Sequence, residues 1–269
     1  MRPGWVLALM VCLAGVPAAA EEVPVDLELV LAVDVSSSVD SVEARLQRKG
    51  YVDALKSPEV LGAIQNGTLG RIAVTYVEWS GSRSHKVVAP WTLLDNKASA
   101  FAFATFVEAS PRGSGHWTSI GGALDFAWPL FDGNGFRGTR RAIDISADGP
   151  NNDGPSPDKI RDLVIGKGIT INGLPIVNSR TQASGLPQMP DYDHYFEDCV
   201  IGGRGAFLVI ADDYGDFARA IKRKLLFEIA GVQPPPAARS PFRRASSHDR
   251  SDCERSWDYR RREDGVPAP

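Results

Sequence analysis

Cysteine is scarce in this chain, and neither sign of charge is in large excess. Three cysteines in 269 residues are too few for a small scaffold held together by several disulfides. Thirty basic and 33 acidic residues give a net charge of -3. This argues against a nucleic-acid-binding protein, because such proteins usually carry a strong basic excess. An apolar share of 43% and a charged share of 23% exclude wholesale disorder and predict a globular chain.

Long apolar runs are also missing, with one exception at the N-terminus. Residues 5–16 are apolar, Arg2 precedes them, and small residues lead to Glu21. This pattern predicts a secretory signal peptide over residues 1–20. The run is shorter than the roughly 20 residues that a membrane span needs, and no later segment is apolar enough. We therefore expect an exported protein, periplasmic or secreted, with no membrane span.

The C-terminal residues differ in composition from the rest. Three consecutive prolines, residues 234–236, cannot continue a helix, and few aliphatic residues follow them. Residues 233–269 are predicted to be a disordered tail, which leaves residues 21–232 as the folded domain. Cys253 lies in this tail. A bridge to Cys199 is possible in an oxidising compartment, but its position favours two free or loosely paired thiols.

Strand and helix patterns alternate through the expected domain. Strands are predicted at residues 25–33, 71–79, 86–94, 140–147, 169–175 and 205–211, and helices at residues 40–55, 96–109, 119–131, 157–165 and 214–229. This alternation predicts an α/β fold with a doubly wound, mostly parallel sheet covered by helices on both faces. The short polar segment at residues 81–84 predicts a hairpin, which adds one antiparallel edge strand.

Oxygen-bearing side chains follow two of the predicted strands. Asp34, Ser36 and Ser38 come after the first strand, Asp148 follows the strand at residues 140–147, and Thr118 precedes a predicted helix. Ligands of such sheets bind beyond the carboxyl ends of the strands. Carboxylate and hydroxyl oxygens suit Mg²⁺, Mn²⁺ or Ca²⁺. The Asp-x-Ser-x-Ser pattern alone is a weak signal, since these residues also cap helices.

Taken together, these five residues resemble the metal-ion-dependent adhesion site (MIDAS) of the von Willebrand factor A (vWA) domain. The resemblance covers about residues 25–231 and implies a mostly parallel sheet with one antiparallel edge strand. It also implies that the serines and the threonine contact Mg²⁺ directly, while the two aspartates act mainly through water. The chain is similar, too, to an uncharacterised family of exported bacterial vWA-like proteins.

Several neighbouring residues are candidates for contact with a ligand. Residues 191–199 mix aromatic and acidic side chains and start beyond the carboxyl end of a predicted strand. They are either a loop packed on the sheet edge or a specificity loop beside the metal. His116 precedes Thr118 by two residues, and we expect it to shape the loop or contact a ligand rather than act as a base. The candidates for ligand contact are His116, Tyr192, His194 and Tyr195.

The sequence favours binding over catalysis. It contains no P-loop, no Gly-x-Ser-x-Gly elbow and no Cys-x-x-Cys motif. We expect a metal-dependent module that captures an Asp or Glu side chain of a partner protein, and not an enzyme. Two alternatives remain open. One is a hydrolase that uses metal-bound water, which would need a nearby base. The other is a structural envelope protein whose metal only stabilises the loops.

Overall fold

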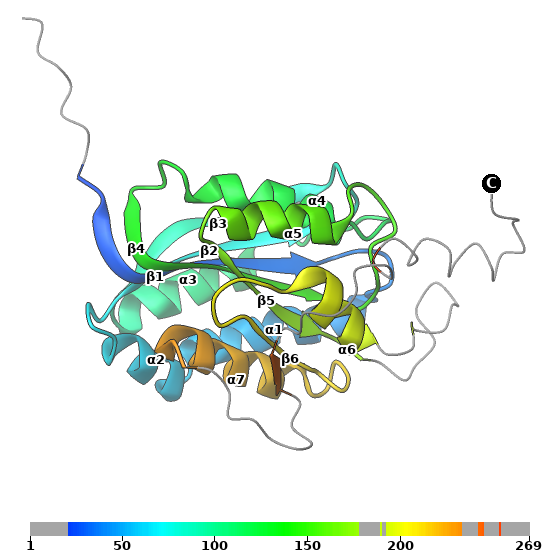
Figure 1. Ribbon diagram of the computed structural model, residues 1–269. Coiled ribbons are helices and arrows are strands. Elements are labelled where there is room, and N and C mark those ends of the chain that lie inside the picture. Colours follow the sequence, from blue (N-terminus) through cyan, green and yellow to red (C-terminus); the bar gives the residue numbers. More distant parts are fainter. Residues whose placement is uncertain (1–20, 178–188, 190–191, 233–241, 245–252, 254–269) are drawn as a thin grey trace, which may run out of the picture.

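In the computed structural model, one sheet runs through the molecule and helices cover both of its faces (Figure 1). The structure describes residues 21–177, 189, 192–232, 242–244 and 253. The predicted signal peptide and most of the predicted tail lie outside the described residues. Within the described part, no helix is both long and apolar enough to cross a membrane.

The sheet has seven strands in the order β3-β2-β1-β4-β5-β6-β7. They are β1 (Val23–Asp34), β2 (Ile72–Trp79), β3 (His85–Leu94), β4 (Phe136–Ala147), β5 (Thr170–Pro175), β6 (Phe207–Val209) and β7 (Phe242–Arg244). The neighbouring strands β2, β1, β4, β5 and β6 pair in parallel, and β3 pairs antiparallel with β2. The predicted mostly parallel fold and its antiparallel edge are confirmed. A second antiparallel edge, β7, was not expected.

Seven α-helices connect or flank the strands in the described part of the chain. They are α1 (Ser41–Lys56), α2 (Pro58–Gln65), α3 (Lys97–Ala109), α4 (Ile120–Ala127), α5 (Pro157–Gly166), α6 (Tyr192–Tyr195) and α7 (Phe217–Ala230). A 3-10 turn, Trp128–Phe131, extends α4, and a π-helical turn, Phe196–Val200, follows α6. The helices α2 and α6 were not predicted.

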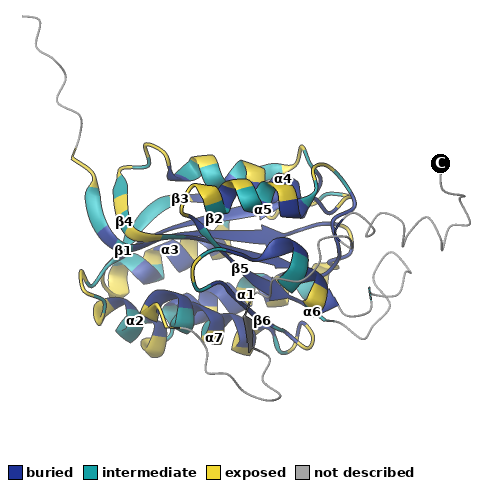
Figure 2. Ribbon diagram, viewed as in Figure 1, coloured by how far each residue is buried: buried dark blue, intermediate teal, exposed yellow. Residues whose placement is uncertain are grey.

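Side-chain alternation along β1 divides the core into two layers. Leu29 and Leu31 face the layer that contains α1, α3 and α7, whereas Val30 and Ala32 face the layer that contains α4 and α5. Both faces are buried, as Figure 2 shows for the central strands. A strand buried on both faces reads as a nearly continuous apolar run. This explains why β1 was recognisable from its sequence.

A cluster of buried charges fastens α7 to the sheet. The Lys224 ammonium lies 2.6 Å from a carboxylate oxygen of Asp144 and 3.3 Å from one of Glu228. Asn172 donates a 2.8 Å hydrogen bond to Glu228. Burial raises the pKa of Asp144 to about 7, the Lys224 charge opposes this, and the Glu228 charge adds to it. The cluster therefore depends on one lysine to balance two carboxylates.

Replacement of Lys224 by methionine should lower the free energy of unfolding by about 3 kcal/mol at pH 8, because it leaves two buried carboxylates without their cation. The loss should shrink toward pH 5. Without Lys224, the folded-state pKa of Asp144 lies still further above its unfolded value, so its contribution is favourable at low pH and is lost as the pH rises. Urea unfolding between pH 5 and 8 measures this.

Lys222 provides the matched control, because it lies on the same helix and pairs with Glu59 at the surface. Lys222→Met should change stability much less, since exposed ion pairs contribute little. An equal loss for Lys224→Met at pH 5 and pH 8 would contradict the assignment of its effect to buried charge.

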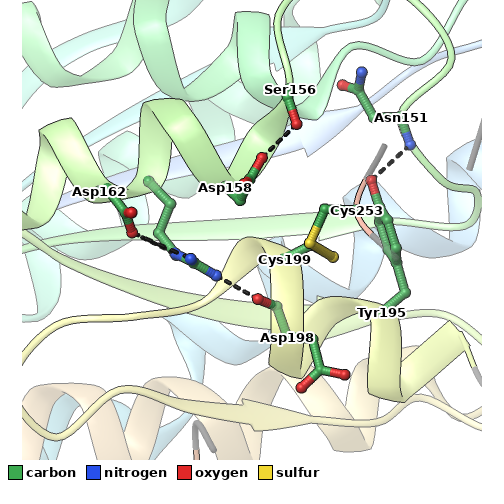
Figure 3. Close-up of a disulfide and its surroundings, with 9 residues drawn as sticks. Asn151, Ser156, Asp158, Asp162, Tyr195, Asp198, Cys199 and Cys253 are labelled. Carbon is green, nitrogen blue, oxygen red and sulfur yellow. Dashed lines mark hydrogen bonds and ion pairs between the residues drawn. A yellow bond between two sulfur atoms is a disulfide. The ribbon is translucent and has the colours of Figure 1, made fainter. Parts of the chain in front are cut away.

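Cys199 and Cys253 form a disulfide (Figure 3). The expectation of free or loosely paired thiols is therefore wrong. Both cysteines are buried. The π-helical turn carries Cys199 into the core layer of α4 and α5, and Cys253 packs in the same layer. Two parts of the predicted tail are therefore attached to the domain: β7 by its pairing with β6 and Cys253 by the disulfide. The composition of the tail did not reveal either attachment.

Loss of this disulfide should lower stability. Cys253→Ala should reduce the free energy of unfolding by about 2 to 4 kcal/mol, because the bond closes a loop of 54 residues. A chain ending at Arg244 should match Cys253→Ala, and a chain ending at Val232 should be less stable still because it also lacks β7. Urea unfolding with and without a reductant measures this. Equal stability of all these chains would show that the tail contributes nothing.

Candidate metal centre

The candidate centre lies where the strand order of the sheet reverses. From β1, the next strand in sequence is on one side, and β4 is on the other. The helices that follow β1 and β4, which are α1 and α5, pack on opposite faces of the sheet. In doubly wound sheets, ligands bind beyond the carboxyl ends of the strands at such a point. Asp34 is the last residue of β1, and Asp148 directly follows β4. The fold thus brings these two carboxylates together.

Hydrogen bonds join four of the predicted site residues into one cluster. A carboxylate oxygen of Asp34 accepts the backbone N–H of Ser36 at 2.7 Å. The hydroxyls of Ser36 and Ser38 are 2.9 Å apart, and Ser38 donates to Asp148 at 2.6 Å. Tyr214 donates to the other oxygen of Asp148 at 3.2 Å. All five of these residues are buried, so their side chains are held in place.

Helix capping does not account for this motif. The N-cap of α1 is Asp40, whose carboxylate accepts the N–H groups of Val42 at 2.6 Å and Glu43 at 2.9 Å. Glu43 accepts the N–H of Asp40 in return, which completes a capping box. Asp40 therefore provides the cap, and Asp34, Ser36 and Ser38 are not N-cap residues of α1.

The loop that carries Thr118 is bound to both other loops. The N–H of Thr118 donates to the side chain of Asn152 at 2.9 Å, and the N–H of Asn152 donates to the carbonyl of Thr118 at 2.8 Å. Ser37 donates to the carbonyl of His116 at 2.9 Å. Thr118 itself is buried. Three loops therefore meet at one edge of the sheet. Four of the predicted metal-binding residues lie on these loops, and Asp34 ends the strand before the first of them.

The carboxylates of Asp34 and Asp148 are buried close enough to repel each other when both are ionised. Burial, and then the charge of Asp148, raise the pKa of Asp34 well above its usual range. Burial also raises the pKa of Asp148 to about 6, although the hydrogen bond from Ser38 opposes this. One oxygen of Asp34, Oδ2, is buried without a hydrogen-bond partner in the described part of the chain. A bound cation would relieve both the repulsion and the missing contact.

The available donors fit a hard divalent cation. Two carboxylates and three hydroxyls are all oxygen donors, which suit Mg²⁺, Mn²⁺ or Ca²⁺. Within the described ranges, no group of three or more His, Cys, Asp or Glu residues is placed to hold a metal ion. The hydroxyls of Ser36, Ser38 and Thr118 would therefore have to complete the coordination, which is what the resemblance to the vWA adhesion site implies.

The two tyrosines expected near a ligand have internal roles. The hydroxyl of Tyr192 donates to the carbonyl of Gly149 at 2.6 Å. The hydroxyl of Tyr195 accepts the N–H of Asn151 at 3.1 Å, as Figure 3 shows. Both side chains are buried, so this segment packs against the rest of the fold, although as the helix α6 and a π-helical turn and not as the expected loop. The tyrosines brace the loop that follows Asp148. The exposed candidates are His116 and His194.

Sequence reasoning missed three residues of this site: Asn152, Tyr214 and Trp117. Asn152 holds the Thr118 loop, and Tyr214 holds Asp148. Trp117 is exposed beside Thr118. The adjacent pair Asn151 and Asn152, within the loop that begins at Asp148, was a detectable signal, because asparagine side chains commonly hydrogen-bond to backbone groups in turns.

Comparison with known proteins shows the family and the fold of this chain. Residues 24–233 match the family described as "Protein of unknown function (DUF1194)". The chain belongs to this family. No curated protein matches this DUF1194 chain in sequence.

Solved structures share its fold. Proximal thread matrix protein 1 from the mussel byssus is 16% identical with a TM-score of 0.54, and the match covers 78% of this chain and 50% of that one. For the von Willebrand factor type A protein from Catenulispora acidiphila, the values are 17%, 0.52, 76% and 43%. For the pilus adhesin SpaC from Lactobacillus rhamnosus GG, they are 14%, 0.54, 78% and 31%. The DUF1194 chain thus has a vWA-type fold and spans half or less of these proteins.

Asp34→Asn should have opposite effects with and without metal. In chelator at pH 8, it should raise the free energy of unfolding by on the order of 1 kcal/mol, because it removes one of two buried like charges. The gain should disappear near pH 4, since a carboxyl whose folded-state pKa is raised costs stability only when ionised. In excess Mg²⁺ or Mn²⁺, the parent should be stabilised and the variant should not.

Thermal unfolding of both proteins in chelator and in metal measures this. Asp213→Asn is the control, because Asp213 is exposed at the same edge and its replacement keeps a side-chain acceptor. This control should respond to metal like the parent. If Asp34→Asn also responds like the parent, Asp34 does not take part in metal binding.

Proposed function

We propose that this protein is an exported, metal-dependent protein-binding module. Its site would hold Mg²⁺, or Mn²⁺ or Ca²⁺, and would capture an Asp or Glu side chain of a partner protein. The observation that carries the proposal is the buried Asp34 oxygen, which has no hydrogen-bond partner in the described part of the chain, close to a second buried carboxylate. The residues that would hold the ion are Asp34, Ser36, Ser38, Thr118 and Asp148.

The balance of charge explains why an acidic partner would be favoured. Three of the five proposed metal-binding residues are neutral hydroxyls, and by resemblance the two aspartates act mainly through water. A bound divalent ion would therefore keep positive charge and prefer an anionic oxygen ligand. The buried hydrogen bonds among Ser36, Ser38 and Asp148 orient these donors before a ligand arrives. This pre-orientation lowers the cost of binding.

The names of the structural neighbours support binding rather than catalysis. One is a pilus adhesin, and another is a byssus matrix protein that has also been solved with a zinc-occupied MIDAS motif. Export is supported by the signal-peptide pattern of residues 1–20 and by the Cys199–Cys253 disulfide, because such bonds persist in oxidising compartments.

The proposal is tested by capture of a partner from the native extract. The mature chain should retain a protein in Mg²⁺ and release it in chelator. Thr118→Ala should weaken retention at least about tenfold, as loss of a group in a central contact does, while stability in chelator stays near that of the parent. Ser114→Ala, which removes an exposed hydroxyl in the same loop, should retain the partner. Quantitative mass spectrometry of the bound fraction measures this.

Two results would contradict the proposal. Equal retention of a genuine partner in excess chelator would make the metal structural. Turnover of a captured substrate in Mg²⁺, lost in Asp148→Asn, would instead support the hydrolase alternative.

A further inference from the structure

Trp117 is the most exposed large apolar side chain in the described part of the chain, with 55% of its surface accessible. It directly precedes Thr118, which we assign to the metal centre. An exposed tryptophan held on a rigid loop is the kind of side chain that dominates binding energy in protein interfaces. The neighbours of Trp117 show which chemical group it would contact.

A reciprocal pair of hydrogen bonds places Trp117 beside a carboxylate. The Thr118 N–H bonds to the Asn152 side chain, and the Asn152 N–H bonds to the Thr118 carbonyl. Trp117 directly precedes Thr118 in the chain, and Asp153 directly follows Asn152. Both border Gly81: a Cβ at Gly81 would lie 3.3 Å from the Cβ of Trp117 and 3.1 Å from Oδ2 of Asp153. The indole and the carboxylate therefore share one surface next to the metal centre.

Asp153 keeps its negative charge on this surface. The backbone N–H of Ser82 donates to Oδ2 of Asp153 at 2.7 Å. This bond is the main reason why the pKa of Asp153 lies below its usual value, and the nearby Arg83 lowers it further. The Asp153 side chain is only partly buried, so its carboxylate can accept another hydrogen bond from a ligand.

The loops around the metal centre are acidic as a whole. Residues 35–43, 80–84, 110–118, 148–156 and 212–216 contain seven acidic residues and two arginines. The acidic residues are Asp40, Glu43, Asp148, Asp153, Asp212, Asp213 and Asp216. A partner segment with only acidic residues would be repelled by this rim even if one of its carboxylates reached the metal. Electrostatic complementarity requires positive charge around that carboxylate.

We propose that Trp117 and Asp153 form a subsite for an arginine side chain that neighbours the metal-binding Asp or Glu of the partner. The assignment rests on the proposed function and adds a second recognition element to it. A guanidinium can stack its flat face on an indole and at the same time donate hydrogen bonds, within the guanidinium plane, to a carboxylate. The Trp117–Asp153 surface offers both contacts, and the shared clamp between Thr118 and Asn152 fixes their distance from the metal centre.

Immobilised peptides test this subsite. Each peptide carries a single glutamate, flanked on both sides by arginine, alanine, leucine or glutamate. In Mn²⁺, the mature chain should bind the arginine-flanked peptide about fivefold more tightly than the alanine-flanked one, as expected for one exposed cation–π contact and one ion pair. Trp117→Ala should remove most of this preference. Asp153→Asn should reduce it while keeping an acceptor for the Ser82 N–H.

Controls separate this subsite from the metal centre. Neither variant should alter the increase in melting temperature that Mn²⁺ produces. Phe106→Ala removes an aromatic side chain of similar exposure, 53%, on α3, and should keep the full arginine preference.

The outcomes distinguish the two proposals. If glutamate peptides bind only in Mn²⁺ but show no arginine preference, or prefer leucine, the subsite is wrong and the metal-dependent function stands. If Trp117→Ala keeps the preference, arginine binds elsewhere and the assignment fails. If no peptide binds in Mn²⁺, or if binding persists in chelator, the proposed function itself fails and the subsite with it.

Discussion

The repulsion between two buried carboxylates is the constraint on which the account of this site depends. Parallel pairing of β1 with β4 places Asp34 and Asp148 at the same edge of the sheet, where the strand order switches and where ligands of such sheets bind. Hydrogen bonds from the Ser36 backbone and the Ser38 hydroxyl orient the carboxylates but supply no charge. We propose that a cation balances this repulsion, and the neighbouring hydroxyl donors suit a hard divalent one.

The surrounding structure holds the three loops in position for that cation. Tyr192 and Tyr195 hydrogen-bond to the loop after Asp148. They lie in the same core layer as the Cys199–Cys253 disulfide. From the opposite face, Tyr214 bonds to Asp148, and Lys224 on the following helix pairs with Asp144 on β4. The helix α7 is thus fastened to the strand that precedes Asp148, so packing on both faces of the sheet supports one edge.

Periodic signals explain what the sequence could predict. The buried strand β1, the β2–β3 hairpin and the amphipathic α7 carry local patterns, and polar residues at strand ends located the site. Long-range pairings carry no such pattern. Cys253 and β7 lie in a segment whose composition indicates disorder, so neither the disulfide nor the added strand was predicted. The buried positions of Tyr192 and Tyr195 were not predicted either, because a tyrosine can point its hydroxyl inward or outward. The short helix α2 had only the Ser57-Pro58 start as its signal.

The most direct test of the central claim is a crystal structure of the mature chain grown with Mn²⁺, with anomalous diffraction measured to locate the metal. The account predicts a single strong peak bounded by the hydroxyls of Ser36, Ser38 and Thr118, with Asp34 and Asp148 beside it. Absence of a peak there at saturating Mn²⁺, or a peak elsewhere that leaves both carboxylates without a cation, would contradict the account.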